Sequence, residues 1–227
     1  MEFLEALNWR YATKRMNGKK IPKEQLEFIL EAIRLAPSSF GLQPYSIIVI
    51  ENVELMKKIQ PIANNQPQIT EASVLLVFAV WENITQLKID EYITRVSTVR
   101  NITEDSLKHK REEMEVQLKN TADENFNWSS KQAYLAMGIG LTAAALEKVD
   151  TTPMESFNQC DLDEILQLKE MGLRSVLLLA LGYRDEKNDT TDELKKVRRE
   201  KENLFITLQS TIGFTASNIN TEFILES

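Results

Sequence analysis

The chain has 227 residues, of which 43% are hydrophobic and 27% are charged, and its formal net charge is −7. This length and composition are ordinary for one compact globular domain and exclude a fibrous or a disordered chain. The negative charge disfavours nucleic acid and anionic membrane surfaces as partners.

The apolar stretches and the numbers of cysteine and histidine residues exclude several further classes of protein. The longest apolar stretches, Ala133–Leu146 and Ser175–Tyr183, are shorter than the roughly 18 residues that a membrane-spanning helix needs. The first residues show no positive segment before an apolar core, so we expect no secretory signal and a cytoplasmic protein. Cys160 and His109 are the only residues of their types, which argues against a disulfide, a metal site and a Ser/His/Asp triad. An enzyme without a metal site, a reactive thiol or a catalytic histidine usually takes its chemistry from a cofactor.

The first part of the chain predicts two amphipathic helices followed by two strands. Apolar spacing predicts a short helix over Glu2–Arg10 and a second helix that begins at Pro22 and stops at Pro37–Ser39. The β-branched run Ser46–Glu51 and the apolar run Val74–Trp81 predict strands, with a short helix between them.

The second part predicts more helices and a third strand. Residues 85–120 are charged with scattered apolar positions, which is typical of one or two surface helices. A long helix is predicted over Trp128–Lys148, and its Ala- and Gly-rich centre allows close approach of another element. Thr151–Phe157 predicts a loop, Asp161 the cap of a short helix, and Ser175–Tyr183 a fully apolar strand.

Strands separated by helices predict an α/β or α+β fold with a central sheet covered by helices. The segment Leu204–Leu208 is one more strand-like run. The sequence shows no internal repeat and no flexible linker, which favours a single domain.

Two basic clusters could bind an anion. Arg10, Lys14 and Arg15 follow the first predicted helix, and five basic residues lie between Lys195 and Lys201. If the fold brings the clusters together, they form a phosphate site, because arginine supplies a fork of donors and lysine a point charge. Spacing alone favours the alternative that both clusters are solvated surface, since charge runs are common.

Two loops concentrate hydroxyl and amide groups. The loop Pro37–Pro44 suits a phosphate or ribityl hydroxyls, although a plain turn has the same composition. The segment Asn65–Gln68 offers amides for the edge of a planar heterocycle, or else a turn that ends a helix. Neither GxGxxG nor GxxxxGK[ST] occurs, so the common phosphate-binding loops are excluded.

Six stretches in one order are informative together: Arg10–Arg15, Ala36–Ser39 with Gln43–Tyr45, Asn65 with Gln68, Ser130–Leu135, Thr152–Phe157, and Lys196–Arg198. In this order and spacing they resemble the signature segments of the FMN-dependent nitroreductase family. The resemblance runs from about residue 3 to residue 208 and is strongest to the oxygen-insensitive, NAD(P)H-dependent nitroreductase and dihydropteridine reductase branch.

The resemblance implies an α+β fold, an α/β/α sandwich in which helices flank a mixed central sheet. It implies one FMN-binding domain over residues 1–208, followed by a polar tail over 209–227, and a homodimer with the long helix at the interface. We expect the C-terminal strand Leu204–Leu208 to be exchanged in the dimer, because a terminal apolar strand can close an exposed sheet edge.

The resemblance also implies the roles of the charged residues. Arg10, Lys196 and Arg198 would hold the FMN phosphate, so that the two basic clusters form one anion site. Lys14 would be the catalytic residue, beside the flavin N1 and O2 edge, where a cation stabilises the reduced flavin.

The other implied contacts are amides, backbone groups and hydroxyls. Asn65 and Gln68 would bind the pyrimidine edge, while Glu155 and Ser156 would present backbone N–H groups to N5 and O4. Ser38 and Ser39 would reach the flavin from the partner subunit, so each site is shared. The complete implied cofactor-binding set is Arg10, Tyr11, Ala12, Lys14, Pro37, Ser38, Ser39, Gly41, Asn65, Gln68, Gln132, Pro153, Met154, Glu155, Ser156, Lys196 and Arg198.

Four positions depart from the family pattern. Ala12 stands where serine is frequent, and Gly41 where asparagine is common, which removes two possible contacts. Gln68 stands where some relatives have lysine, so we expect a flavin that is harder to reduce than theirs. Ser156 replaces a usual glycine and would be strained if its φ were positive.

The expected function is an FMN-dependent oxidoreductase with ping-pong hydride transfer from NADH or NADPH to a nitroaromatic, quinone or pteridine acceptor. One alternative is a flavin-using dehalogenase or flavin-destruction enzyme on the same fold, with a substrate lid in residues 85–120. Another is a non-enzymatic protein with a decayed flavin pocket. The physiological acceptor and the choice between NADH and NADPH stay open, because no ribose-reading residue can be assigned.

Overall fold

A four-stranded sheet with helices on both faces organises the chain in the computed structural model, which describes residues 2–191 and 194–207. The chain forms two units, Met1–Leu194 and Lys195–Ser227, and each is described by itself. The helices and strands are α1 (Phe3–Trp9), α2 (Lys23–Arg34), β1 (Tyr45–Ile50), α3 (Val53–Ile62), α4 (Gln68–Glu71), β2 (Val74–Trp81), α5 (Gln86–Arg100), α6 (Lys108–Glu115), α7 (Ala122–Leu146), β3 (Asp150–Met154), α8 (Gln159–Ile165), β4 (Leu173–Gly182) and α9 (Lys201–Leu204). Short 3₁₀ turns occur at Ser39–Gly41, Asp105–Leu107, Val116–Lys119 and Leu168–Met171.

The sheet has the strand order β1-β2-β4-β3, so β2 and β4 lie at its centre and β1 and β3 at its edges. Side chains of β2 alternate between two buried faces: Phe78 packs on one side, and Leu75 and Val77 pack on the other. A strand buried on both faces has a continuous apolar sequence, as this one does.

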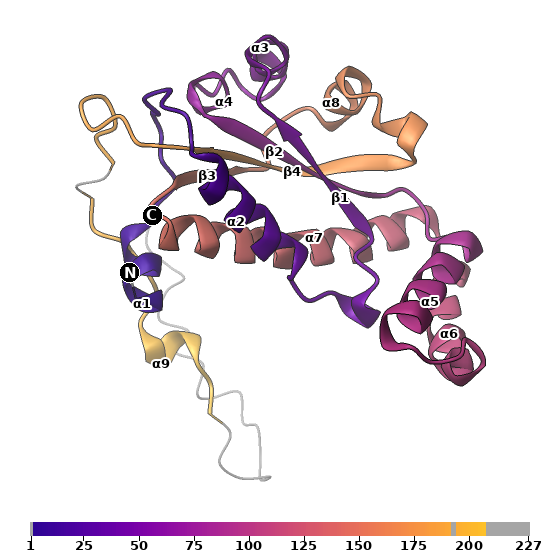
Figure 1. Ribbon diagram of the computed structural model, residues 1–227. Helices are drawn as coiled ribbons and strands as arrows, with labels where there is room; N and C mark the ends of the chain where they lie inside the picture. Colours follow the sequence, from indigo (N-terminus) through magenta and orange to yellow (C-terminus); the bar gives the residue numbers. More distant parts are fainter. Residues whose placement is uncertain (1, 192–193, 208–227) are drawn as a thin grey trace, which may run out of the picture. The chain divides into compact units, whose positions relative to one another are not determined.

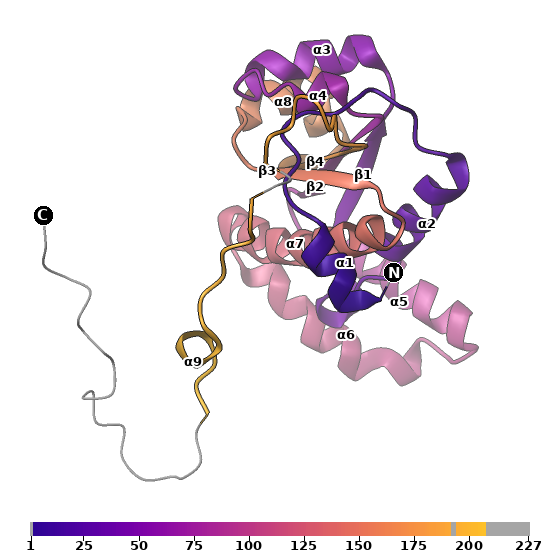
Figure 2. The same ribbon diagram turned by 90° about the vertical axis from the view of Figure 1, so that its left-hand side faces the viewer.

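The helices form a layer on each face of the sheet. Figure 1 shows α2 and α7 on one face and α3, α4 and α8 on the other, and Figure 2 shows the same layers from the side. Gly140 of α7 lies against Ile33 of α2, and a Cβ at Gly140 would lie 2.9 Å from that side chain. The small residues at the centre of the long helix therefore allow the close approach that the sequence predicts.

The α+β class with helices on both faces of a central sheet is confirmed. The sheet itself differs from the expected mixed sheet, because the three strand pairings of the described residues are antiparallel. Parallel pairing is limited there to the isolated bridge between Ala12 and Thr151.

Four local predictions are corrected. Thr151–Phe157 is not simply a loop, because residues up to Met154 form β3, and an edge strand tolerates Pro153. The long helix begins at Ala122, six residues before the predicted Trp128, because Thr121 and Glu124 form a capping box.

The other two corrections concern a helix cap and the C-terminal strand. Asn158, not Asp161, caps α8, since its side chain accepts the N–H of Asp161 at 3.3 Å. In the strand-like segment Leu204–Leu208, Leu204 ends α9, residues 205–207 have no regular structure, and Leu208 lies outside the described residues. Strand exchange between subunits stays a prediction. None of the helices described is long and apolar enough to cross a membrane.

Candidate functional site

The basic loop after α1 is fixed against β3, far along the chain. The Thr13 N–H donates to the carbonyl of Thr151 at 3.3 Å, and Ala12 forms a bridge with the same residue. Thr152 donates its hydroxyl to the Thr13 carbonyl, and the Thr13 side chain is fully buried. The edge strand β3 thus brings the predicted residues 10–14 beside the predicted residues 153–156.

Two carboxylates hold the backbone of this loop from its other side. Asp189 accepts the Lys14 N–H at 2.7 Å, and Glu71 accepts the Met16 N–H at 2.9 Å. The Nε and Nη2 groups of Arg15 also donate to the Glu71 carboxylate, with a shortest distance of 2.7 Å. The charge of Arg15 is therefore balanced within the protein.

Lys14 differs from its neighbour Arg15. Its side chain is exposed, and its ammonium group has no hydrogen-bond or ion-pair partner among the described residues. A cation on a hydrogen-bonded backbone, without a counter-ion among the described residues, is suited to stabilise a negative charge on a bound molecule.

The segment 64–68 lies beside the loop that follows β3. Asn64 donates its side-chain amide to the Ser156 carbonyl at 3.3 Å, and the Asn158 N–H donates to Ile62 at 2.8 Å. Gln68 begins α4, the helix that ends at Glu71, so the same short helix also touches the basic loop. Three sequence-distant segments therefore meet in one place.

Polar groups at this meeting point lack partners among the described residues. The Gln68 side chain is only 3% exposed, and its Oε1 atom has no hydrogen-bond partner there. The backbone N–H groups of Glu155 and Ser156 also donate to no described residue. Because buried polar groups are nearly always hydrogen-bonded, the unpartnered Gln68 oxygen indicates a bound polar molecule or water.

Two further predictions concern Asn65 and Ser156. Asn65 is exposed and adopts a φ of 52°, a left-handed conformation that asparagine tolerates. The φ of Ser156 is not positive, so the strain that a positive φ would cause at this position does not arise. The serine therefore fits the backbone without a glycine.

A cavity of about 370 Å³ lies next to Glu155, between α7, the loop after β3, and β4. Tyr134 of α7 lines the cavity, and burial, together with the nearby Glu155 carboxylate, raises the pKa of Tyr134 to about 12. The tyrosine stays protonated at neutral pH, and its hydroxyl donates to the Glu155 carboxylate beside this cavity.

The serine loop lies elsewhere in the same chain. Gln132 accepts the Ser39 N–H at 2.8 Å, and the Gln43 N–H donates to the Ser38 hydroxyl at 3.0 Å. Tyr92 of α5 donates to the Phe40 carbonyl at 2.5 Å. Figure 1 shows α5 at the end of α7 opposite to α1 and β3. Ser38 and Ser39 are therefore not brought to Lys14 within one chain.

The departure at Gly41 has a structural reason. Its φ is +78°, and a Cβ would lie 2.9 Å from the Tyr92 hydroxyl. A side chain at this position would be strained and would push on the tyrosine that holds the loop. Gln132, predicted as a cofactor contact, has its carbonyl oxygen engaged by Ser39 and so positions this loop.

Lys196 and Arg198 lie in the second unit, which begins at Lys195. The guanidinium of Arg198 donates to the Val197 carbonyl at 2.6 Å. Because the two units are described separately, the predicted meeting of these residues with Arg10 stays a prediction.

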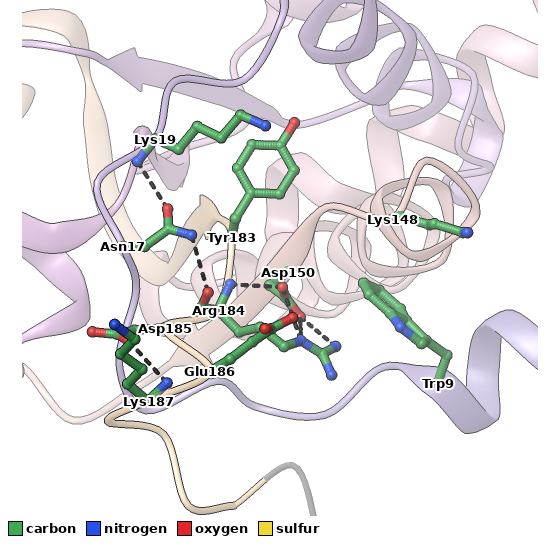
Figure 3. Close-up of a pocket in the computed structure, with 10 residues that line it drawn as sticks. All are labelled: Trp9, Asn17, Lys19, Lys148, Asp150, Tyr183, Arg184, Asp185, Glu186 and Lys187. Carbon is green, nitrogen blue, oxygen red and sulfur yellow. Dashed lines mark hydrogen bonds and ion pairs between the residues drawn. The ribbon is translucent and has the colours of Figure 1, made fainter.

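Sequence reasoning missed the acidic residues that hold the basic loop, as well as an arginine that lies behind it. The Arg184 guanidinium lies 4.5 Å from the Trp9 ring centroid and 4.7 Å from that of Tyr11, and it pairs with the buried Asp150 at 2.6 Å. Figure 3 shows this ion pair at a cavity of about 530 Å³. A single acidic residue in a sequence gives no signal of such a role. The described residues contain no group of three His, Cys, Asp or Glu side chains that could hold a metal ion.

Comparison with known proteins identifies the family. The model of the "Nitroreductase family" matches residues 7–183. A Staphylococcus saprophyticus protein named "Putative NAD(P)H nitroreductase" is 32% identical over 216 residues, which cover 88% of this chain and 94% of the relative. A Bacillus subtilis protein of the same name is 33% identical over 196 residues, which cover 81% of this chain and 89% of the relative.

Solved structures show the same fold. A "putative nitroreductase" from Bacillus subtilis has a TM-score of 0.79 at 19% identity and covers 91% of this chain and 98% of its own. A protein from Exiguobacterium sibiricum, described as a "putative nitroreductase in complex with FMN", has a TM-score of 0.76 at 20% identity and covers 92% and 98%. The chain belongs to the nitroreductase family and has its α+β fold.

Proposed function

We propose that the protein is an FMN-dependent oxidoreductase that transfers hydride from NADH or NADPH to a nitroaromatic, quinone or pteridine acceptor. The observation that carries the proposal is the exposed Lys14, on a loop that contacts α4, the helix that begins with the buried Gln68, whose side-chain oxygen has no partner among the described residues. The relatives' printed names and the FMN complex of the Exiguobacterium protein support the same assignment.

The groups at this place fit the polar edge of a flavin. A flavin pyrimidine ring offers an N–H donor for the Gln68 oxygen and carbonyl acceptors for N–H groups, and Asn65 supplies a further amide. The backbone N–H groups of Glu155 and Ser156 are available as donors. Lys14 would lie at the N1 and O2 edge, where reduction places negative charge.

The remaining binding residues come from three parts of the chain. Arg10, Lys196 and Arg198 would hold the phosphate of the cofactor. Ser38 and Ser39 would be supplied by the partner subunit, which agrees with the position of their loop at the other end of α7. The rest of the proposed set would complete the site, with Pro37, Gly41 and Gln132 supplied with the serine loop of the partner subunit: Tyr11, Ala12, Pro37, Gly41, Gln132, Pro153 and Met154.

Bound FMN would supply the chemistry, accepting hydride from the reduced nicotinamide and passing it to the acceptor. Nicotinamide and acceptor would occupy the same place in turn, which is a ping-pong order. The protein's own residues would bind the cofactor and place the Lys14 charge.

The same proposal includes a homodimer. Leu135 and Ile139, four residues apart and so on one face of α7, form an apolar stripe with exposed fractions of 51% and 40%. Exposed apolar side chains in a row along a central helix are typical of an interface between subunits.

The visible absorption spectrum of the purified protein, recorded anaerobically before and after NADH or NADPH is added, tests the function. We expect the two-banded flavin spectrum and its bleaching by one or both nucleotides. A colourless protein that neither binds added FMN nor regains these bands would contradict the proposal.

A further inference from the structure

Asp189 lies in the turn that follows β4, outside every segment that the sequence singles out. The residue is 2% exposed. The turn is tied to the basic loop through its backbone, because the Asp185 N–H donates to the Arg15 carbonyl at 3.0 Å and the Asp189 N–H donates to Asp185 at 2.8 Å. Figure 3 shows Asp185–Lys187, where this turn begins.

Both oxygens of the Asp189 carboxylate are used. Oδ2 accepts the N–H groups of Lys14 at 2.7 Å and Arg15 at 3.3 Å, and the Tyr11 hydroxyl at 3.2 Å. Oδ1 accepts the N–H of Thr191 at 2.9 Å and its hydroxyl. Five donors therefore converge on one buried group, and three of them belong to the loop that carries Lys14.

The carboxylate is ionised when it makes these contacts. Burial raises the pKa of Asp189, but hydrogen bonds from Thr191, Lys14 and Arg15 outweigh burial and leave the pKa below its ordinary value. Burial raises the pKa of Tyr11 to about 12, so its hydroxyl remains a donor. An ionised carboxylate only accepts hydrogen bonds, which matches a surrounding that only donates them.

We propose that Asp189 is a positioning residue: it fixes the backbone of Lys14 so that the ammonium group sits at the edge of the bound cofactor. This role rests on the proposed flavin function. Asp189 acts through Lys14, since its own oxygens are occupied by donors of the protein.

The direction in which the reduction potential of the flavin shifts separates this role from a direct effect of the Asp189 charge. Removing a negative charge near the flavin would by itself make the reduction potential more positive. Displacing the Lys14 ammonium group would make the potential more negative, because the reduced flavin loses its cation. The two causes predict opposite shifts.

The test compares full-length wild-type protein with Asp189→Asn, in which a single amide oxygen replaces two acceptors. We expect exchange of the Lys14 and Arg15 amide hydrogens to accelerate about tenfold, the FMN dissociation constant to rise about tenfold, and the potential of bound FMN to become more negative. In a Lys14→Met background, the same Asp189→Asn change should no longer make the potential more negative, because the ammonium group that it displaces is absent.

Asp163→Asn is the matched control, because Asp163 is 4% exposed and accepts the Ser175 N–H at 2.8 Å without touching the basic loop. We expect it to change neither amide exchange in the loop nor the potential. If Asp189→Asn does not fold, Thr191→Val removes one donor to the carboxylate and should produce smaller shifts of the same sign.

Three results would overturn the positioning role: unchanged amide exchange in Asp189→Asn, a more positive potential, or a negative shift that persists without Lys14. If wild-type protein binds no FMN, the proposed function fails. Amide exchange in Asp189→Asn still decides whether Asp189 holds the loop: accelerated exchange shows that it does, and unchanged exchange shows that it does not.

Discussion

At the scale of single residues, neighbours of the same charge type have different environments. Arg15 is paired with Glu71, whereas Lys14 has no partner among the described residues. The sequence places both in one basic cluster and gives no means of separating them, because the difference is made by Glu71, 56 positions away. The structure leaves Lys14 as the cation of that pair available to a ligand.

Replacing Lys14 by methionine tests this availability. Lys14→Met keeps the length of the side chain and removes its charge, so the reduced flavin loses its stabilising cation. We expect the potential of bound FMN to fall by roughly 30 mV, which corresponds to about a tenfold change for a two-electron couple, and turnover to slow. The measurements are a spectroscopic redox titration and steady-state kinetics. Lys169→Met, at an exposed position in another part of the fold, is the control. An unaltered potential together with unaltered turnover would rule out the role.

Asp189 also predicts a dependence of stability on pH. The pKa of this group is lower in the folded protein than its ordinary value of 3.8, so its contribution is present above 3.8 and is lost as the pH falls through the folded pKa. We expect Asp189→Asn to reduce the free energy of unfolding by about 2 kcal/mol, equally from about pH 5 to pH 8. The difference from wild type should shrink below pH 3.8.

Urea denaturation followed by tryptophan fluorescence at a series of pH values measures that difference. A difference that grows as the pH falls below 3.8 would show that the Asp189 pKa is not lowered by folding.

At the scale of helices and strands, the success of sequence prediction follows the strength of the local signal. β2 is predicted at its observed bounds, since its eight residues are apolar and all but Trp81 are buried. β3 is missed, because an edge strand needs no apolar run and this one contains Pro153. That omission matters for the site, since β3 is the element that joins the basic loop to residues 153–156.

The residues of the candidate site also fall into two groups, those that the sequence indicates and those that only the structure reveals. Motif order indicates the residues with exposed chemistry, such as Lys14 and Glu155, because their types and spacing resemble those of a family. It does not indicate Asp189, Glu71 or Asp150, which act by accepting hydrogen bonds in folded geometry. A buried carboxylate is recognised by its partners, and those become neighbours only in three dimensions.

The C-terminal segment provides a prediction about an element. In the described chain Leu204 ends the short helix α9, and Phe205 and Ile206 are exposed by 66% and 81%. We expect these apolar residues to be covered by the partner subunit as an exchanged strand. Truncation before Asn203 should therefore weaken the dimer, whereas truncation after Leu208 should leave it intact. Light scattering with size-exclusion chromatography over a dilution series gives the answer, and equal dimer stability in both variants would argue against exchange.

At the scale of the whole molecule, the two parts of the proposed site lie at different ends of one chain. The basic loop is attached to β3, and the serine loop is attached to α5 and to Gln132 of α7. A second copy of the chain can complete the site by placing its own serine loop beside Lys14. Dimerisation and cofactor binding should then be linked, because a ligand that contacts both subunits stabilises the dimer by mass action.

Substitution of Leu135 by glutamate tests that linkage. Leu135 lies with Ile139 on the apolar stripe of α7 and is 51% exposed, so the monomer tolerates a charge there. Burial of an unpaired carboxylate at the interface should raise the dimer dissociation constant about a hundredfold or more. The FMN content should fall in parallel and recover at high protein concentration, because the serine loop of the partner becomes available again. Met171→Glu is the matched control, since Met171 is 55% exposed but belongs to the 3₁₀ turn between α8 and β4 and not to the apolar stripe on α7. A Leu135→Glu monomer that retains full FMN affinity would show that each chain binds the cofactor alone, and the serines would then have no part in the site.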